Sequence, residues 1–272
     1  MGQVLFIVWR ESVEAMLVIG ILYAWLNKNP EGAAGKRWLW GGVGVGLAMA
    51  AALAFGLFAV SSAFENGQEI FQTVLVFTAS ALIVHMVLWM REHGRTLKRD
   101  LESGLAEHAA RANWWGVLIL TAIAVAREGS ETVVFLYGML ASADGSTLVS
   151  MATAALAGFV LALGTFYLLQ LGGRVLSWRL FFRLTEILLL LLAAALFISG
   201  VEKLISMDVL PALVDPVWDS SGLLDDMSPT GGVVASLTGY RAHPALTSLI
   251  AYGGFWLAVG AMMAWRNRGT QR

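Results

Sequence analysis

The sequence predicts an all-α integral membrane protein with seven transmembrane helices. Of its 272 residues, 58% are hydrophobic and only 14% are charged, and the mean hydropathy is +0.71. Soluble domains carry about 25% charged residues, so this chain has too little polar surface for water. Its apolar residues form blocks of roughly 20, the length that a helix needs to cross about 30 Å of hydrocarbon. The alternating pattern of a transmembrane β-barrel is absent from the sequence.

The seven predicted spans form a single domain over residues 1–272. The start, MGQVLFIV, has no basic segment before its apolar run, and Arg10 interrupts that run. It is therefore interpreted as part of the first span and not as a cleaved signal peptide. The charged segment 91–113 is predicted to be a surface helix. The spans cover residues 4–26, 38–60, 68–90, 114–140, 147–170, 180–200 and 247–265.

Positive charge is distributed unevenly between the predicted loops. With the N-terminus outside, fourteen Lys and Arg residues fall inside, whereas only Lys203 and Arg241 fall outside. Because cytoplasmic loops carry an excess of Lys and Arg, we predict an outside N-terminus and an inside C-terminus. Six acidic residues lie in the longest outer loop, residues 201–246. That loop is either a solvated connection or a surface that concentrates cations.

An offset of 117 residues relates charged positions in spans one to three to charged positions in spans four to six. The pairs are Arg10 and Arg127, Glu11 and Glu128, Glu14 and Glu131, and Glu69 and Glu186. Residues 4–90 and 114–200 are therefore interpreted as two copies of one three-helix unit. Since three is odd, the copies cross in opposite directions, which is the inverted repeat of many secondary transporters.

Small residues recur every four positions in two spans. They are Gly42, Gly46, Ala50 and Ala54 in span two, and Ala154, Gly158 and Ala162 in span five. Because this spacing lets helices approach closely, both spans are predicted to pack tightly against neighbours.

Two copies of the motif R-E-x-x-E interrupt spans one and four, at residues 10–14 and 127–131. On a helix, the glutamates of each copy share a face, and the arginine can pair with the second glutamate. Three charges near mid-membrane cost roughly 8–10 kcal/mol together. The twelve Val, Leu, Ile and Phe residues of span one return only roughly 4–7 kcal/mol. The charged faces are therefore predicted to turn toward each other, water or an ion.

Two interpretations of the motifs compete. Buried arginine–glutamate bridges would hold the bundle together, but they leave one glutamate of each motif unpaired. Two facing motifs carry about −2 in a low dielectric, and either a multivalent cation or protonation would relieve that repulsion. The second interpretation is therefore a cation site.

The ligand types favour a hard metal ion. Carboxylate oxygens suit hard ions, the chain has no cysteine, and neither motif contains histidine. His85 is interpreted as a hydrogen-bonded packing residue. Met86 and Met90 are interpreted as core residues in preference to a copper(I) site.

The doubled motif on the first and fourth of seven spans resembles that of the oxidase-dependent iron permeases, also called the iron/lead transporter family. The similarity extends almost end to end, and includes WMREHGRTLKRDLE, LVDPVWDSSGLL and GYRAHPAL. It implies a high-affinity, multi-pass iron importer in a bacterial cell membrane, which is not an enzyme and has no cofactor apart from the transported ion. By this resemblance, the iron ligands are Glu11, Glu14, Glu128 and Glu131.

The resemblance also implies a partner protein. Fungal relatives receive Fe(III) from a multicopper ferroxidase, and bacterial relatives work with periplasmic iron-binding or redox proteins. We expect such a partner here, together with membrane lipid, and no nucleic acid, for which the net charge of −1 gives no indication.

The acidic residues suggest an ordered path across the membrane. Glu65, Glu69 and the outer loop would collect the ion, the two motifs would carry it, and Glu186 would pass it inside. Arg10 and Arg127 would each balance one glutamate.

Two positions on this path have another interpretation. Glu186 can instead pair with Arg183, three residues earlier. At the start of span three, relatives often have two acidic residues. This chain has Glu69 but carries Gln72 in place of the second acid, so the outer end of the path would depend on Glu65 and Glu69.

Other function classes stay open at this point. One is a proton-coupled carrier of another cation, such as lead, manganese or a polyamine. The other is an intramembrane di-iron oxidoreductase, although such sites usually contain Glu-x-x-His. The sequence does not distinguish Fe(II) from Fe(III).

Overall fold

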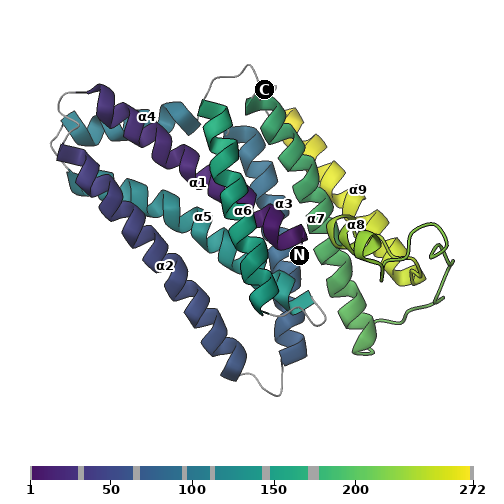
Figure 1. The fold of residues 1–272 in the computed structure, drawn as a ribbon. Coiled ribbons are helices and arrows are strands. Elements are labelled where there is room, and N and C mark those ends of the chain that lie inside the picture. The colour runs from purple at the N-terminus through teal and green to yellow at the C-terminus, as the bar shows by residue number, and fades with distance from the viewer. Residues whose placement is uncertain are drawn as a thin grey trace.

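The computed structural model describes residues 2–29, 34–63, 68–93, 97–110, 114–142, 148–170 and 178–269. Within these ranges the chain forms helices and no strand, so the all-α prediction is confirmed (Figure 1). The helices are α1 Gly2–Lys28, α2 Lys36–Ala63, α3 Gln68–His93, α4 Leu97–Ala110, α5 Trp114–Ser142, α6 Leu148–Gln170, α7 Trp178–Ser206, α8 Pro229–Thr238 and α9 Leu246–Gly269.

Each predicted span matches one long helix. The helix α4 covers residues 97–110 of the predicted surface helix, whose residues 91–93 belong instead to the end of α3. Among the described residues, five helices are long and apolar enough to cross a membrane: α2, α3, α6, α7 and α9. The helices α1 and α5 are just as long, with 27 and 29 residues, but each carries the three charges of one motif near its middle. The chain is an all-α membrane protein.

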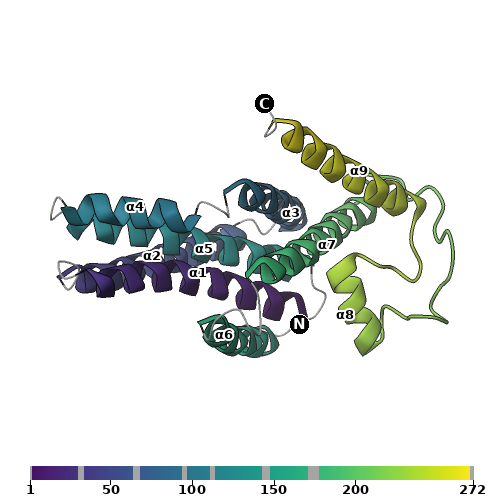
Figure 2. The ribbon, with the colours of Figure 1, turned by 90° about the horizontal axis from the view of Figure 1, so that it is seen from above.

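The long helices pack crosswise between the two predicted repeats. The helix α2 packs along α5, and α6 packs along α1. Figure 2 shows α1 with α6 on one side and α3 on the other. The helices α3 and α7 also pack together, where the Ser80 hydroxyl donates to the Ala193 carbonyl oxygen at 2.8 Å. Both motif helices therefore lie inside the bundle, each covered by a helix from the other half of the chain.

Glycines make the closest of these contacts. A Cβ on Gly42 would lie 2.5 Å from the Leu118 carbonyl oxygen, and one on Gly158 would lie 2.5 Å from the Leu5 carbonyl oxygen. Any side chain at these positions would collide with the backbone of the neighbouring helix. The predicted close packing of spans two and five is confirmed at Gly42 and Gly158.

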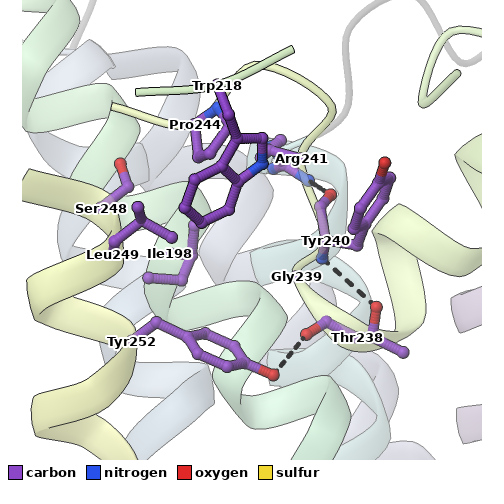
Figure 3. A pocket seen from close by; sticks show the side chains of 10 residues that line it. All are labelled: Ile198, Trp218, Thr238, Gly239, Tyr240, Arg241, Pro244, Ser248, Leu249 and Tyr252. Atoms are coloured by element: carbon purple, nitrogen blue, oxygen red, sulfur yellow. Dashed lines mark hydrogen bonds between the residues drawn. The ribbon is translucent and has the colours of Figure 1, made fainter. Parts of the chain in front are cut away.

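The segment after α7 has more structure than the sequence predicts. The helix α7 continues to Ser206, past the predicted end at residue 200, and α8 lies within the predicted loop 201–246. The Ser228 hydroxyl caps α8 by accepting a hydrogen bond from the Gly231 amide at 3.0 Å, and the helix ends at Gly239 with φ of 76°. This segment packs over α7 and α9 and encloses a pocket (Figure 3).

Two glycines of α2 test the packing account. We expect Gly42→Ala to lower the melting temperature of the purified protein, because overpacking costs about 1–3 kcal/mol. Gly44 faces open space. Gly44→Ala should leave the melting temperature unchanged or raise it slightly, since Ala is the better helix former by about 0.5–1 kcal/mol. Equal effects of the two substitutions would contradict the account.

Candidate functional site

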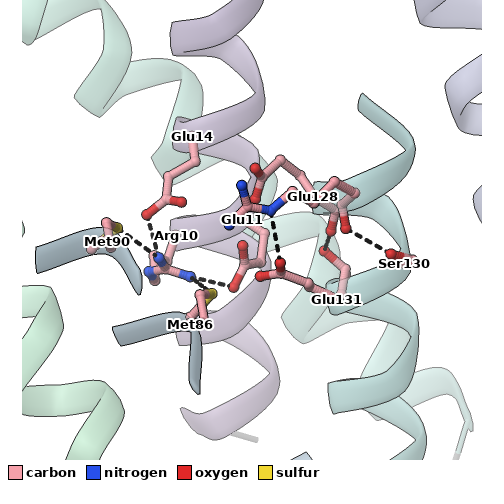
Figure 4. Close-up of polar contacts among 10 residues, drawn as sticks. Arg10, Glu11, Glu14, Met86, Met90, Glu128, Ser130 and Glu131 are labelled. Carbon is pink, nitrogen blue, oxygen red and sulfur yellow. Dashed lines mark hydrogen bonds and ion pairs between the residues drawn. The ribbon is translucent and has the colours of Figure 1, made fainter. Parts of the chain in front are cut away.

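The helices α1 and α5 bring the two R-E-x-x-E motifs against each other, as Figure 4 shows. Carboxylate oxygens of Glu11, Glu128 and Glu131 lie within 4.8 Å of one another. Glu11 is 2% exposed and Glu128 is 8% exposed. The charged faces therefore turn inward toward each other, as predicted. We call these three residues, together with Glu14, the glutamate cluster.

Arg10 is completely buried and holds both glutamates of its own motif. Its guanidinium donates to Glu11 Oε1 at 2.5 Å and also pairs with Glu14 Oε1. The thioether sulfurs of Met86 and Met90 on α3 lie 3.1 and 3.4 Å from its two terminal nitrogens. Arg10 thus pairs with both glutamates of the first motif, whereas the sequence predicted that it balances a single glutamate.

Arg127 is held differently, and its side chain is 38% exposed. Its Nε donates to Glu131 Oε1 at 3.2 Å. Its guanidinium carbon lies 3.8 Å from the centre of the Trp89 ring, which is a cation–π contact. The second motif is therefore more open than the first.

Three buried oxygens of the glutamate cluster have no hydrogen-bond partner among the described residues. They are the Oε2 atoms of Glu11, Glu128 and Glu131. Leaving a buried charged oxygen without a partner is costly. The three oxygens belong to the residues whose carboxylates approach within 4.8 Å of one another, so one cation between these carboxylates could interact with all three residues. Oxygen-only ligation suits a hard or borderline metal ion.

The formal charge of the site also favours a cation. With every group ionised, four glutamates contribute −4 and the two arginines +2, which leaves −2 in a buried volume. Arg10 and Arg127 therefore reduce the repulsion between the carboxylates without removing it.

A cavity of about 180 Å³ lies beside the cluster between α3 and α5. Its lining residues are Leu82, His85, Met86, Trp89, Arg127 and Glu131. Glu131 belongs to both the cavity and the glutamate cluster, so the cavity connects directly with the candidate ligands. His85 is exposed and lines this cavity, which corrects its interpretation as a packing residue.

Other residues of the predicted path lie apart from the cluster. Glu69 is exposed in the first turn of α3. Glu186 on α7 pairs with Arg91 on α3, and not with Arg183 as the alternative interpretation proposed. Glu65 lies outside the described residues. The two motifs themselves form one cluster.

Sequence reasoning missed the role of α3 in the site. Met86, Trp89 and Met90 lie three and four residues apart, so they share one helix face. That spacing was visible in VHMVLWM, but it could not show that this face meets Arg10 and Arg127.

The sequence of residues 1–266 matches the Iron permease FTR1 family. The chain therefore belongs to this family: it is an iron permease of the cell membrane, a multi-pass transporter and not an enzyme. The oxidoreductase alternative is thereby set aside.

Two similar proteins carry the name Ferrous iron permease EfeU. The one from Yersinia pestis is 28% identical over 253 residues, covering 90% of this chain and 87% of the relative. The one from Escherichia coli O6:H1 (strain CFT073) is 28% identical over 259 residues, covering 90% and 89%. No solved structure matches the chain significantly.

The two arginines should differ in their contribution to stability. Arg10→Met leaves Glu11 and Glu14 without their buried partner, and we expect a loss of about 3–5 kcal/mol. Arg127→Met should cost clearly less, because Arg127 is partly exposed. Melting temperatures of the two purified variants test this expectation, and a larger loss for Arg127→Met would contradict it.

Proposed function

We propose that the chain imports iron through the glutamate cluster, with Glu11, Glu128 and Glu131 as direct ligands. Three buried carboxylates that approach within 4.8 Å of one another, each with an unpartnered oxygen, support this role most strongly. Glu14 stays with Arg10 when the site is empty and is available to the ion as it passes. Arg10 and Arg127 balance the remaining charge.

Ferrous iron is the proposed cargo. One Fe(II) ion balances the formal charge of −2 of the empty cluster, and the relatives are named ferrous iron permeases. Manganese(II) and lead(II) carry the same charge, so we expect both to compete with iron.

We propose that all seven long helices cross the membrane, with the N-terminus outside. At 1.5 Å per residue, α1 and α5 are each about 40 Å long, and each covers the charged face of the other. The crosswise packing of α2 on α5 and of α6 on α1 supports two inverted repeats, because each repeat then completes the other.

The cavity between α3 and α5 is the proposed access route to the cluster. Movement of one repeat against the other would then alternate access between the two sides of the membrane. The Arg91–Glu186 pair joins α3 to α7 at the proposed inner end, so it has to open when the ion leaves. In this account Glu186 controls exit and is not a ligand of the central site.

A protein partner is proposed at the outer face. The acidic segment 207–228 would receive iron from an extracytoplasmic iron-binding or iron-oxidising protein and raise the local concentration of cations.

Uptake of radioactive Fe(II) into proteoliposomes tests the proposed ligands. We expect Glu11→Gln, Glu128→Gln and Glu131→Gln each to abolish uptake at matched protein levels, because glutamine keeps the shape and removes the charge. Glu102→Gln on the surface helix α4 is the matched control and should transport normally. Normal uptake in all three cluster variants would show that these glutamates are structural bridges.

The chain has no cysteine, so single introduced cysteines can test the orientation. Leu223 is 92% exposed in the segment before α8, and Ser103 is exposed on α4. In intact cells, a membrane-impermeant maleimide should label Leu223→Cys, and should label Ser103→Cys only after lysis. The reverse pattern would invert the proposed orientation.

A further inference from the structure

The cavity between α3 and α5 contains a histidine that the proposed ligand set does not use. His85 lies well inside α3, is exposed, and lines the cavity together with Glu131 of the glutamate cluster. Ionisable side chains inside a membrane almost always face the protein interior or a water-filled cavity, and they mark substrate and ion pathways. Among the described lining residues, only His85 and Glu131 carry a nitrogen or oxygen that ordinarily ligates a divalent ion.

Two contacts between α3 and α5 fix the relative direction of these helices. The guanidinium carbon of Arg127 lies 3.8 Å from the centre of the Trp89 ring. Further along, a Cβ on Gly138 would lie 2.7 Å from the Cβ of Ala79. Between the two contacts the residue number falls on α3 and rises on α5, so the helices are antiparallel.

This direction places His85 level with Glu131. Each lies four residues, or about one helical turn, from the contact between Trp89 and Arg127. On both helices the turn leads the same way, because the residue number falls on α3 where it rises on α5. The two side chains line one cavity of about 180 Å³, so an imidazole and a carboxylate border the same small space.

Arg127 is the group that an entering ion has to displace from Glu131. Its Nε donates to Glu131 Oε1 at 3.2 Å, and its side chain is 38% exposed. A divalent cation carries twice the charge of the guanidinium and can replace it at this oxygen. The face of the Trp89 ring remains available to Arg127 when the ion is bound.

Imidazole adds a selection among divalent ions that the glutamate cluster lacks. The cluster offers carboxylate oxygens, which suit magnesium, calcium and manganese. Imidazole suits iron, nickel, copper and zinc, and affinity at such sites rises from Mn(II) to Fe(II). A site that combines the two ligand types therefore favours Fe(II) over Mn(II), although both ions have the same charge.

We propose that His85 and Glu131 hold the entering ion in the α3–α5 cavity and select Fe(II) over Mn(II) before the ion reaches the glutamate cluster. This inference rests on the proposed transport function and names a specificity-determining residue for it. With two protein ligands, and with Arg127 competing for Glu131, the cavity position holds the ion only in passing. Because Glu131 serves both positions, the chain still binds one ion at a time, and stable binding requires the cluster.

Competition during anaerobic uptake of radioactive Fe(II) into proteoliposomes tests the selection. Mn(II) and Zn(II) are added separately to wild type and to His85→Gln, which removes the imidazole and keeps a polar side chain. In His85→Gln the inhibition constant of Zn(II) should rise about tenfold, the lower limit for losing a supporting group at a metal site. The inhibition constant of Mn(II) should change little, so the ratio of the two constants moves.

Three further variants complete the design. His243→Gln, the same substitution at an exposed histidine before α9, should leave the ratio as in wild type. His85→Cys should restore strong inhibition by Zn(II), because a thiolate is itself a zinc ligand. His85→Ser, which matches the size of His85→Cys without the sulfur, should behave as His85→Gln does.

An unchanged ratio of the Zn(II) and Mn(II) constants in His85→Gln would overturn the inference, since a purely structural role moves both constants together or neither. Loss of uptake in His85→Gln that His85→Cys does not restore would overturn it as well. In both cases the proposed transport site stands if the cluster variants are inactive. Normal uptake in the cluster variants would instead overturn the transport site, so the two failures are distinguishable.

Discussion

The rest of the structure depends on the burial of charge between α1 and α5. Neither helix is apolar enough to cross a membrane with its motif facing lipid, because three charges outweigh the apolar residues around them. Because the two motifs face each other, their charged groups lie in a shared polar core and avoid contact with lipid. The crosswise packing then follows, since α2 and α6 cover the motif helices through glycine contacts that allow backbone to meet backbone. The remaining side is closed by α3, which presents Met86, Trp89 and Met90 to the two arginines.

The two motifs have the same sequence pattern but different surroundings. Arg10 is enclosed by both glutamates of its motif and by two thioethers, whereas Arg127 stacks on Trp89 beside a cavity. One enclosed motif and one accessible motif suit an ion site that has to bind and then release its ion. Under the proposed function, the enclosed first motif would set the geometry of the ligands, and the accessible second motif would let the ion reach Glu131. This asymmetry gives the repeated motif two roles within one site.

Much of the fold could be predicted because long apolar blocks and their charged interruptions leave few alternatives. The same reasoning predicted that the two charged motif faces turn inward, toward each other, water or an ion, since charges in such helices are unstable against lipid. It did not predict α8, whose ten residues PTGGVVASLT include two glycines and carry little helical signal. It also could not assign Glu186 to Arg91, because residues 95 apart in sequence meet only through the packing of α3 on α7. The pocket between α7, α9 and the segment before α9 was missed for the same reason.

The central claim is that both motifs hold one ion together, and the stoichiometry of Fe(II) binding tests it most directly. Anaerobic equilibrium dialysis of the purified chain should give one ion per chain for wild type. It should give none for Glu11→Gln or for Glu128→Gln, because each substitution removes one wall of the same site. Two ions in wild type, with one retained in each variant, would contradict the account and show two independent sites.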